Sequence, residues 1–180
     1  DGFTIGNTTT GSTFYGIAVS NTALLVANCR ITLNAYGIVA GGSLLTITDS
    51  KLDNNQYEGI NAAQNTSLTL TNVTLQANGR HNVYADSGEV VMNGGSSVSA
   101  GNWGLYWTGT ATISGVSFLN NQYGVTVNGP VILTDTTLRG TKARYAVEAY
   151  TAVNTVTHSF TNLIANNTIY NSASSPIWIQ

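Results

Sequence analysis

Eight carboxylate side chains are the residues of this chain best suited to acid–base chemistry or metal binding. They are Asp1, Asp49, Asp53, Glu58, Asp86, Glu89, Asp135 and Glu148. Hydrolysis of a glycosidic bond uses two carboxyl groups that lie about 5 to 9.5 Å apart. These carboxylates are spread along the whole sequence, so the fold decides whether any two of them lie that close.

Few other side chains offer chemistry. Arg30 and Lys51 are candidate ligands for an anionic group, and neither His81 nor His158 belongs to a serine, cysteine and acid constellation. Cys29 is the single cysteine, so an internal disulfide is excluded. The sequence contains no glycine-rich phosphate loop, no Cys/His metal spacing and no Asp-x-Asp-x-Asp-Gly calcium loop. We therefore expect no cofactor, no metal site and no catalytic residue that the sequence alone identifies.

The composition indicates one ordered domain with few charged residues. Only 8% of the residues are charged while 42% are hydrophobic, a balance that disordered chains avoid. The formal charge of -2 provides no basic surface for nucleic acid. No apolar run approaches the roughly 18 residues of a membrane-spanning helix, so membrane insertion is not expected.

The elements that position the candidate residues are marked by a recurring phrase, an aromatic residue, usually a glycine, and then a short aliphatic strand. The phrase begins at Tyr15, Tyr36, Tyr57, Trp103 and Tyr123, with weaker copies at His81, Tyr145 and Ser175. Successive copies are 21, 21, 24, 22, 20, 22 and 30 residues apart. A fixed period with insertions predicts a repeat architecture.

Each repeat predicts about three short strands. Apolar residues alternate with Thr, Asn, Asp and Lys after every aromatic phrase, as in 45–52 and 68–75, and no segment shows a helical apolar stripe. Such a strand trio buries its apolar face only if the coils wind into a solenoid, with like residues stacked about 4.8 Å apart. The sequence therefore predicts an all-β solenoid of about seven coils of roughly 21 residues each.

Asparagine recurs at one corner of the predicted coil. Asn34, Asn55, Asn78 and Asn121 each lie three places after the last inward apolar residue of their repeat. Asparagine tolerates the left-handed backbone conformation that a tight corner needs. We expect a stacked asparagine ladder there, with each of these residues in that conformation.

Over nearly the whole chain, the Gly-Ile-x-Val phrase followed by a Leu-x-Ile/Val-x-x-small-x-Ile/Leu segment and Asn resembles the repeat of right-handed parallel β-helix proteins. That group includes pectate-lyase-like enzymes, phage tailspikes and microbial surface proteins. The resemblance implies the fold, and the same solenoid carries many unrelated functions. Residues 1–180 are expected to form a single domain, a piece of a longer chain, because Asp1 to Ile5 read as the last strand of a preceding coil.

Coil number sets the axial position of each carboxylate. Asp49 and Asp135 occupy similar places but lie four coils apart, about 19 Å, which is too far for them to cooperate. Asp49 and Asp53 are expected on the outer wall, where they would relieve the repulsion between Arg30 and Lys51, stacked in adjacent coils. Such a basic pair is alternatively a receptor for an anionic sugar.

The remaining acids and His81 are more simply explained by structural roles. Asp86 and Glu89 bracket a Ser-Gly turn, where acids usually serve solubility. His81 takes an aromatic position of the repeat, which favours a structural role.

Aromatic residues are the most promising surface feature. In the outward column of the first strand, Tyr84 and Tyr106 would lie one coil apart beside Trp103, a platform on which a sugar ring could stack. Glu148, with Asn61 and Thr126, would supply hydrogen bonds. The alternatives are that the aromatic column simply covers the corner, or that this face is buried between chains.

Two classes of function follow. We expect a non-catalytic extracellular module with a structural or adhesive role that binds a polysaccharide, such as a tailspike or fibre piece or a cell-surface or outer-layer protein, able to associate with itself end to end. The alternative is a polysaccharide-degrading lyase or glycoside hydrolase that uses Glu148, Asp86 or Glu89, or acids of flanking coils. Glycosylation motifs occur at Asn7, Asn65, Asn72 and Asn166, as chance alone would produce in so Asn- and Thr-rich a chain.

Overall fold

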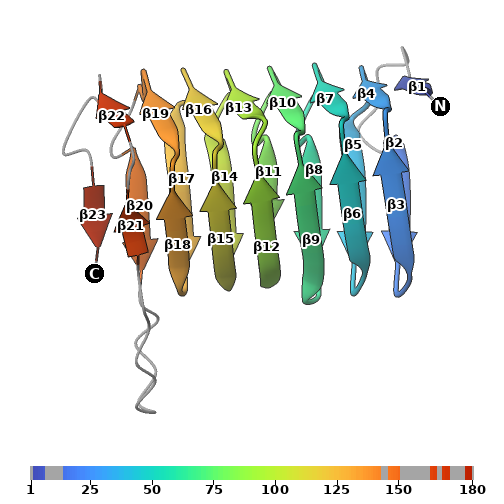
Figure 1. Cartoon of the computed structure of the whole chain (residues 1–180). Helices are drawn as coiled ribbons and strands as arrows, with labels where there is room; N and C mark the ends of the chain where they lie inside the picture. Colours follow the sequence, from blue (N-terminus) through green and yellow to red (C-terminus); the bar gives the residue numbers. More distant parts are fainter. Residues whose placement is uncertain are drawn as a thin grey trace.

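The computed structural model describes residues 2–6, 14–142, 146–150, 163–165, 168–170 and 177–179. In these residues the chain winds as a parallel β-solenoid, and successive coils lie side by side along one axis (Figure 1). The solenoid predicted from the repeat period is therefore confirmed. No helix in the described ranges is long and apolar enough to cross a membrane.

Three parallel sheets run the length of the solenoid, and each described coil contributes one strand to each sheet. The first sheet contains β1 (Thr4–Gly6), β4 (Arg30–Thr32), β7 (Lys51–Asp53), β10 (Thr74–Gln76), β13 (Ser96–Val98), β16 (Ser117–Leu119), β19 (Thr137–Arg139) and β22 (Thr168–Tyr170). The second contains β2 (Tyr15–Ser20), β5 (Tyr36–Gly41), β8 (Ile60–Ala63), β11 (Val83–Ala85), β14 (Trp103–Thr108), β17 (Tyr123–Asn128), β20 (Val147–Tyr150) and β23 (Ile177–Ile179). The third contains β3 (Ala23–Ala27), β6 (Leu44–Thr48), β9 (Thr66–Thr71), β12 (Gly88–Asn93), β15 (Thr110–Ser114), β18 (Val131–Thr134) and β21 (Leu163–Ala165).

The strand register follows the sequence repeat. Ile17 pairs with Ile38, and Ile38 with Ile60, so like residues stack directly over one another. Between β2 and β19, the part described without a gap, the chain completes six coils, slightly fewer than the seven predicted. Strands β20, β21 and β22 extend the three sheets beyond them.

The interior is filled by stacked columns of aliphatic side chains, with large residues placed beside small ones. Phe118 stacks on Ser97, whose small side chain leaves room in that column. Trp107 stacks on Ala85, and its indole N–H donates to the Gly88 carbonyl at 3.2 Å, so the buried polar group has a partner. This alternation keeps the core close-packed where the repeat is least regular.

The glycine of the repeated phrase is required by the approach of the next coil. A Cβ atom on Gly16 would lie 2.6 Å from the carbonyl oxygen of Gly37, and the same clash arises between Gly37 and Gly59. A side chain on Gly16 or Gly37 would clash with the next backbone, which explains the glycine in these coils, whereas Asn82 and Ala146 take the equivalent position in two later coils.

The asparagine ladder is confirmed in its first part and continues differently afterwards. The Asn34 side chain donates to Asn55 at 3.2 Å, and Asn55 donates to Asn78 at 2.9 Å. The next coil has Ala100 at this position, and there Asn78 donates instead to Asn82 at 2.7 Å. Asn82 in turn donates to the Ser97 hydroxyl at 2.9 Å.

Asn121 rejoins this polar column, donating to the Ser97 carbonyl and accepting from the Ala100 amide. Asn82 and Ser97 thus supply the hydrogen bonds of the missing asparagine, which the sequence did not predict.

The expected left-handed conformation of the ladder residues is wrong by one position. Positive φ angles fall on the residue before each rung, at Leu33, Asn54, Ala77, Ser99 and Asn120. The left-handed residue turns the chain, and the next side chain then points inward, where its amide reaches the carbonyls and amides of the adjacent coils.

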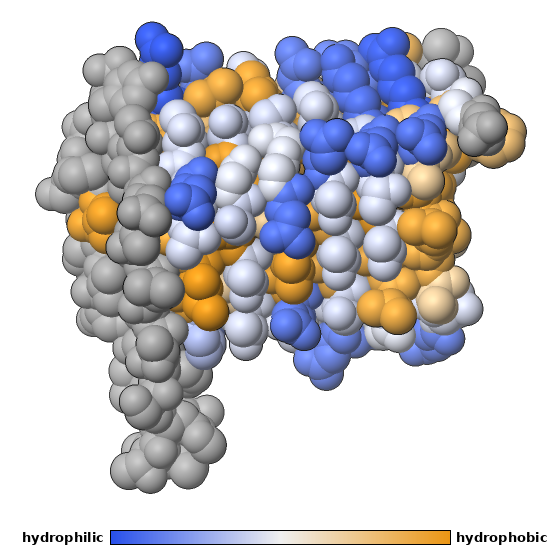
Figure 2. Space-filling view, viewed as in Figure 1, coloured by the Kyte–Doolittle hydropathy of each residue, from blue (hydrophilic) through white to orange (hydrophobic). Residues whose placement is uncertain are grey.

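Figure 2 shows the outer face of the sheet that contains β3 to β18, with pale, near-neutral side chains over most of it. Apolar surface gathers at the N-terminal end over β3 and β6, where Leu25 is 66% exposed and Leu44 is 53% exposed. Charged groups are sparse on this face, in line with the composition.

Replacement of Asn55 by Ala should lower the free energy of unfolding by roughly 1–3 kcal/mol, because the Asn34 amide and side chain lose their common acceptor inside the protein. Urea unfolding followed by circular dichroism measures the change. Gln56→Ala is the matched control, since the Gln56 side chain is exposed next to it. Equal stability of the two variants would show that the ladder contributes nothing to folding.

Candidate functional site

Aromatic rings line one corner of the solenoid along its axis, as the repeat predicted. We call Tyr15, Tyr36, Tyr57, His81, Tyr84, Trp103, Tyr106 and Tyr123 the aromatic strip. Ring centroids of neighbours lie 5.6 Å apart for Tyr15 and Tyr36, 5.0 Å for Tyr36 and Tyr57, 5.0 Å for His81 and Trp103, and 4.8 Å for Trp103 and Tyr123. Tyr145 and His158 lie outside the described residues.

Tyr84 and Tyr106 lie where the sequence predicted, in register on the outward face of β11 and β14. Their rings are nearly parallel, at 15°, with centroids 5.4 Å apart, and Trp103 meets Tyr106 edge-on at 5.1 Å. This is an offset stack, in which each ring covers only part of its neighbour's face. Both tyrosines and Trp103 are half-buried, so part of each ring remains open to solvent.

His81 is a buried member of the strip. Its side chain is buried and stacks on Tyr84 at 5.3 Å, while the Trp103 amide donates to His81 Nδ1 at 3.3 Å. Burial, with the positive charge of Arg80, lowers the pKa of His81 to about 4. The imidazole is therefore neutral at pH 7, and its 3.8 Å contact with Glu58 is not an ion pair.

Glu58 is a buried carboxylate beside the strip that the sequence reading did not single out. It is the extra residue between aromatic and glycine in Tyr57-Glu58-Gly59, where the preceding coil has Tyr36-Gly37. Glu58 Oε1 lies 3.4 Å from Arg80 Nη1, and Oε2 is buried with no hydrogen-bond partner in the described part of the chain. Burial raises the pKa of Glu58, although Arg80 opposes the shift. An extra residue that changes the direction of a side chain is typical of a β-bulge. This insertion was the sequence feature that could have indicated the unusual position of Glu58.

Glu148 keeps its predicted register opposite Thr126 but lies buried, with 5% exposure. The Thr126 hydroxyl donates to Glu148 Oε2 at 3.1 Å, and Trp103 Nε1 donates to the Thr126 oxygen at 3.0 Å. Among the residues that the structure describes, no hydrogen-bond partner reaches Glu148 Oε1, which is buried. Glu58 and Glu148 lie in coils four apart, about 19 Å along the axis, so they do not form a catalytic pair.

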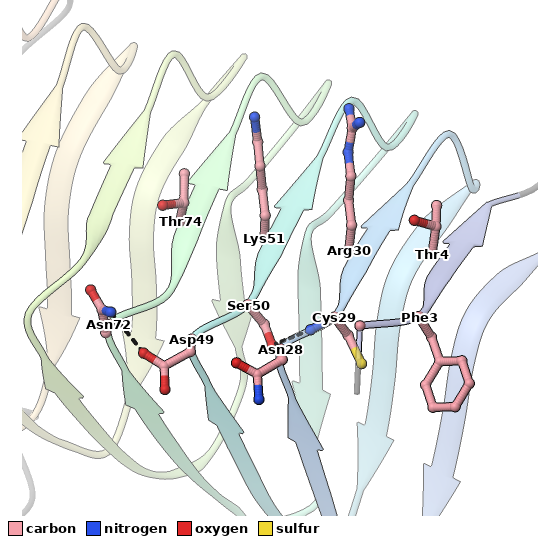
Figure 3. A pocket seen from close by; sticks show the side chains of 11 residues that line it. Phe3, Thr4, Asn28, Cys29, Arg30, Asp49, Ser50, Lys51, Asn72 and Thr74 are labelled. Carbon is pink, nitrogen blue, oxygen red and sulfur yellow. Dashed lines mark hydrogen bonds between the residues drawn. The ribbon is translucent and has the colours of Figure 1, made fainter.

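A polar groove of about 430 Å³ lies at another corner, near the N-terminal end (Figure 3). Thr4, Arg30, Lys51 and Thr74 form one side of it, in register on adjacent strands. Figure 3 shows the Arg30 and Lys51 side chains extending in the same direction, away from the corner residues Asn28, Asp49 and Asn72. The predicted stacking of the two cations is confirmed.

Asp53, expected on the outer wall, is instead buried beneath these two cations. Arg30 donates to both of its oxygens, at 3.0 and 2.8 Å, and Lys51 Nζ lies at 3.3 Å. Burial raises the pKa of Asp53, but the hydrogen bonds from Arg30 and the positive charge of Lys51 outweigh it and hold the pKa below its usual value. Asp49 takes no part, because it accepts a hydrogen bond from Asn72 at 2.7 Å. The basic pair thus neutralises an internal carboxylate.

The remaining acids in the described residues are dispersed. Asp86 and Glu89 are exposed, and Asp86 accepts from the adjacent Ser87 hydroxyl at 3.1 Å, as in a solvated turn. No group of three or more His, Cys, Asp or Glu in the described part of the chain could hold a metal ion. Asn65 and Asn72 of the glycosylation motifs lie exposed at corners, and Asn7 and Asn166 fall outside the described residues.

Comparison with known proteins agrees with the architecture. The family model for the right-handed β-helix region matches residues 1–129, and the chain belongs to this family. No curated protein and no solved structure matches this chain. The family defines the fold and leaves the activity to be argued from the site.

The negative charge on Asp53 should make the stability of the folded protein depend on pH in the acidic range. Because its pKa is held below that of the unfolded chain, Asp53 stabilises the fold above about pH 4 and loses this effect as pH falls further. Asp53→Asn should lower the melting temperature by a few degrees at pH 7 and by less at pH 3. Asp49→Asn, at an exposed position, is the control, and an equal loss for Asp53→Asn at both pH values would contradict the assignment.

The contribution of Glu58 to folding stability should change with pH in the opposite direction. Its raised pKa means that the charged form is disfavoured in the folded state, so stability falls as pH rises from about 4 through the folded pKa. Glu58→Gln should leave the protein at least as stable as the parent at pH 7, with the difference vanishing near pH 4. Thermal unfolding across this range measures it, with Glu89→Gln as the exposed control. A variant clearly less stable at pH 7 would show that the contact with Arg80 outweighs burial.

Proposed function

We propose that this chain is a non-catalytic carbohydrate-binding module of an extracellular, cell-surface or virion-surface protein, and that the aromatic strip takes an uncharged glycan. The observation that carries the proposal is the partly exposed offset stack of Tyr84 and Tyr106 beside Trp103. Partly uncovered aromatic faces suit the C–H faces of sugar rings, and the phenol hydroxyls suit their polar edges.

The rigidity of the strip supports this proposal. Tyr84 packs between His81 at 5.3 Å and Tyr106 at 5.4 Å, and Trp103 is flanked by His81, Tyr106 and Tyr123. Strands β11 and β14, which carry Tyr84, Trp103 and Tyr106, are each hydrogen-bonded to the coils on both sides. A binding surface that is already ordered loses little conformational entropy when a ligand binds, which favours affinity.

The charges around the strip favour an uncharged ligand. Glu58 and Glu148 contribute two carboxylates and Arg80 one guanidinium, while His81 is neutral, so negative charge is in excess among the described residues. Uronic acids and sulfated sugars would be repelled at short range. The strip also follows the solenoid axis over several coils, which suits an extended chain of sugar units.

A glycan-binding screen with neutral and anionic polysaccharides tests the function. Calorimetry should show binding of a neutral glycan, and Tyr84→Ala/Tyr106→Ala should weaken it at least tenfold, about 1.4 kcal/mol. Phe3→Ala, which removes a 68% exposed ring outside the strip, is the control and should bind normally.

Reducing-sugar and unsaturated-product assays on the same samples test the alternative of a polysaccharide-degrading enzyme. Binding without product supports the module. Turnover that is lost in Glu148→Gln would instead establish an enzyme, and binding unaffected by loss of both tyrosines would place the ligand elsewhere.

A further inference from the structure

A chain of hydrogen bonds runs along the axis from the aromatic strip to a buried carboxylate. Trp103 on β14 donates through Nε1 to Thr126 on β17 at 3.0 Å, and Thr126 donates to Glu148 on β20 at 3.1 Å. The three residues come from three consecutive coils. Thr126 and Glu148 are 4% and 5% exposed, so water does not readily replace either partner.

The Glu148 carboxylate gives this series of hydrogen bonds a single direction. An ionised carboxylate accepts hydrogen bonds and donates none, whereas a threonine hydroxyl has one proton and two lone pairs. With Glu148 in place, the Thr126 proton is directed to Oε2, and a lone pair of the same oxygen is left facing the Trp103 N–H. Without Glu148, the hydroxyl proton is free to rotate toward the indole, where it would oppose the N–H.

The orientation of the Trp103 ring matters for its neighbours. Its centroid lies 5.1 Å from Tyr106, 4.8 Å from Tyr123 and 5.0 Å from His81. A rotation of the indole would therefore change the exposed surface beside Tyr106, where the glycan is proposed to bind. The buried position of Glu148, with Oε1 enclosed, argues against a direct contact between its carboxylate and a sugar.

We propose that Glu148 is a positioning residue, which acts through Thr126 to fix the Trp103 indole in the orientation that the glycan requires. The proposal revises the expectation that Glu148 binds sugar directly. Its binding consequence rests on the proposed function, and its structural consequence does not.

Two measurements on the full chain test the two consequences separately. The first is the indole N–H signal of Trp103 in a ¹H–¹⁵N NMR spectrum, assigned by its absence in Trp103→Phe. Glu148→Ala and Thr126→Val should each shift this signal and speed its exchange with solvent. Glu148→Gln and Thr126→Ser, which keep an acceptor and a hydroxyl, should leave it near its parental position. Glu89→Ala removes an exposed carboxylate and is the control.

The second measurement is affinity for the neutral glycan found in the screen. Glu148→Ala and Thr126→Val should each weaken binding about fivefold, the effect of one lost hydrogen bond, and the double variant should be no weaker than either one. Both effects should disappear in a Trp103→Phe background. Additive losses, or a loss in Glu148→Ala without a shift of the indole signal, would mean that Glu148 contacts the sugar and would overturn the proposal.

The outcomes also separate this proposal from the proposed function. If the indole signal responds as expected but no glycan binds the parental protein, the hydrogen-bond chain stands and carbohydrate binding fails. An indole signal unchanged in Glu148→Ala and in Thr126→Val would refute the positioning role, whatever binds to the strip.

Discussion

The constraint on which this structure depends is that every coil must return its backbone to hydrogen-bonding distance of the same residues one coil earlier. Strand partners across the three sheets are like residues of successive repeats, such as Leu45 with Leu68. Any feature that works in one coil is therefore presented again by the next, about 4.8 Å further along. Glycine after the corner aromatic, positive φ before each ladder position and inward aliphatic columns are all local answers to this one geometric demand.

Charge is rare in this protein, and three of its carboxylates are buried in three different ways. Two cations from neighbouring strands compensate Asp53. Glu58 is only partly compensated, by Arg80, and its pKa rises. Glu148 accepts from a hydroxyl that is itself tied to an indole. An unpaired buried carboxylate is costly, so such groups are more informative about function than the exposed acids of the turns.

The sequence predicts the repeating part of the fold well, because inward apolar residues, corner asparagines and aromatic phrases recur at fixed positions. The pairing of Tyr84 with Tyr106 and of Thr126 with Glu148 follows from counting positions alone. What could not be predicted depends on side chains that reach out of their own coil. Asp53 is buried because Arg30 extends over it from the coil before, and Glu58 is re-aimed by a single extra residue. The left-handed residue lies one place earlier than expected because side-chain direction, not residue type, decides which position turns the chain.

The replacement of the missing asparagine rung by Asn82 and Ser97 has a consequence for the coils as units of evolution and design. Asn82 accepts from Asn78 in the coil before and donates to Ser97 within its own coil, and Ser97 leaves the space that Phe118 fills in the coil after. Three successive repeats are thus matched to one another in polarity and in volume. The solenoid looks modular in outline, yet duplication, removal or exchange of a single repeat in this region would leave an amide without its acceptor or a phenyl ring without its space. Such rearrangements would succeed only when the matched repeats move together.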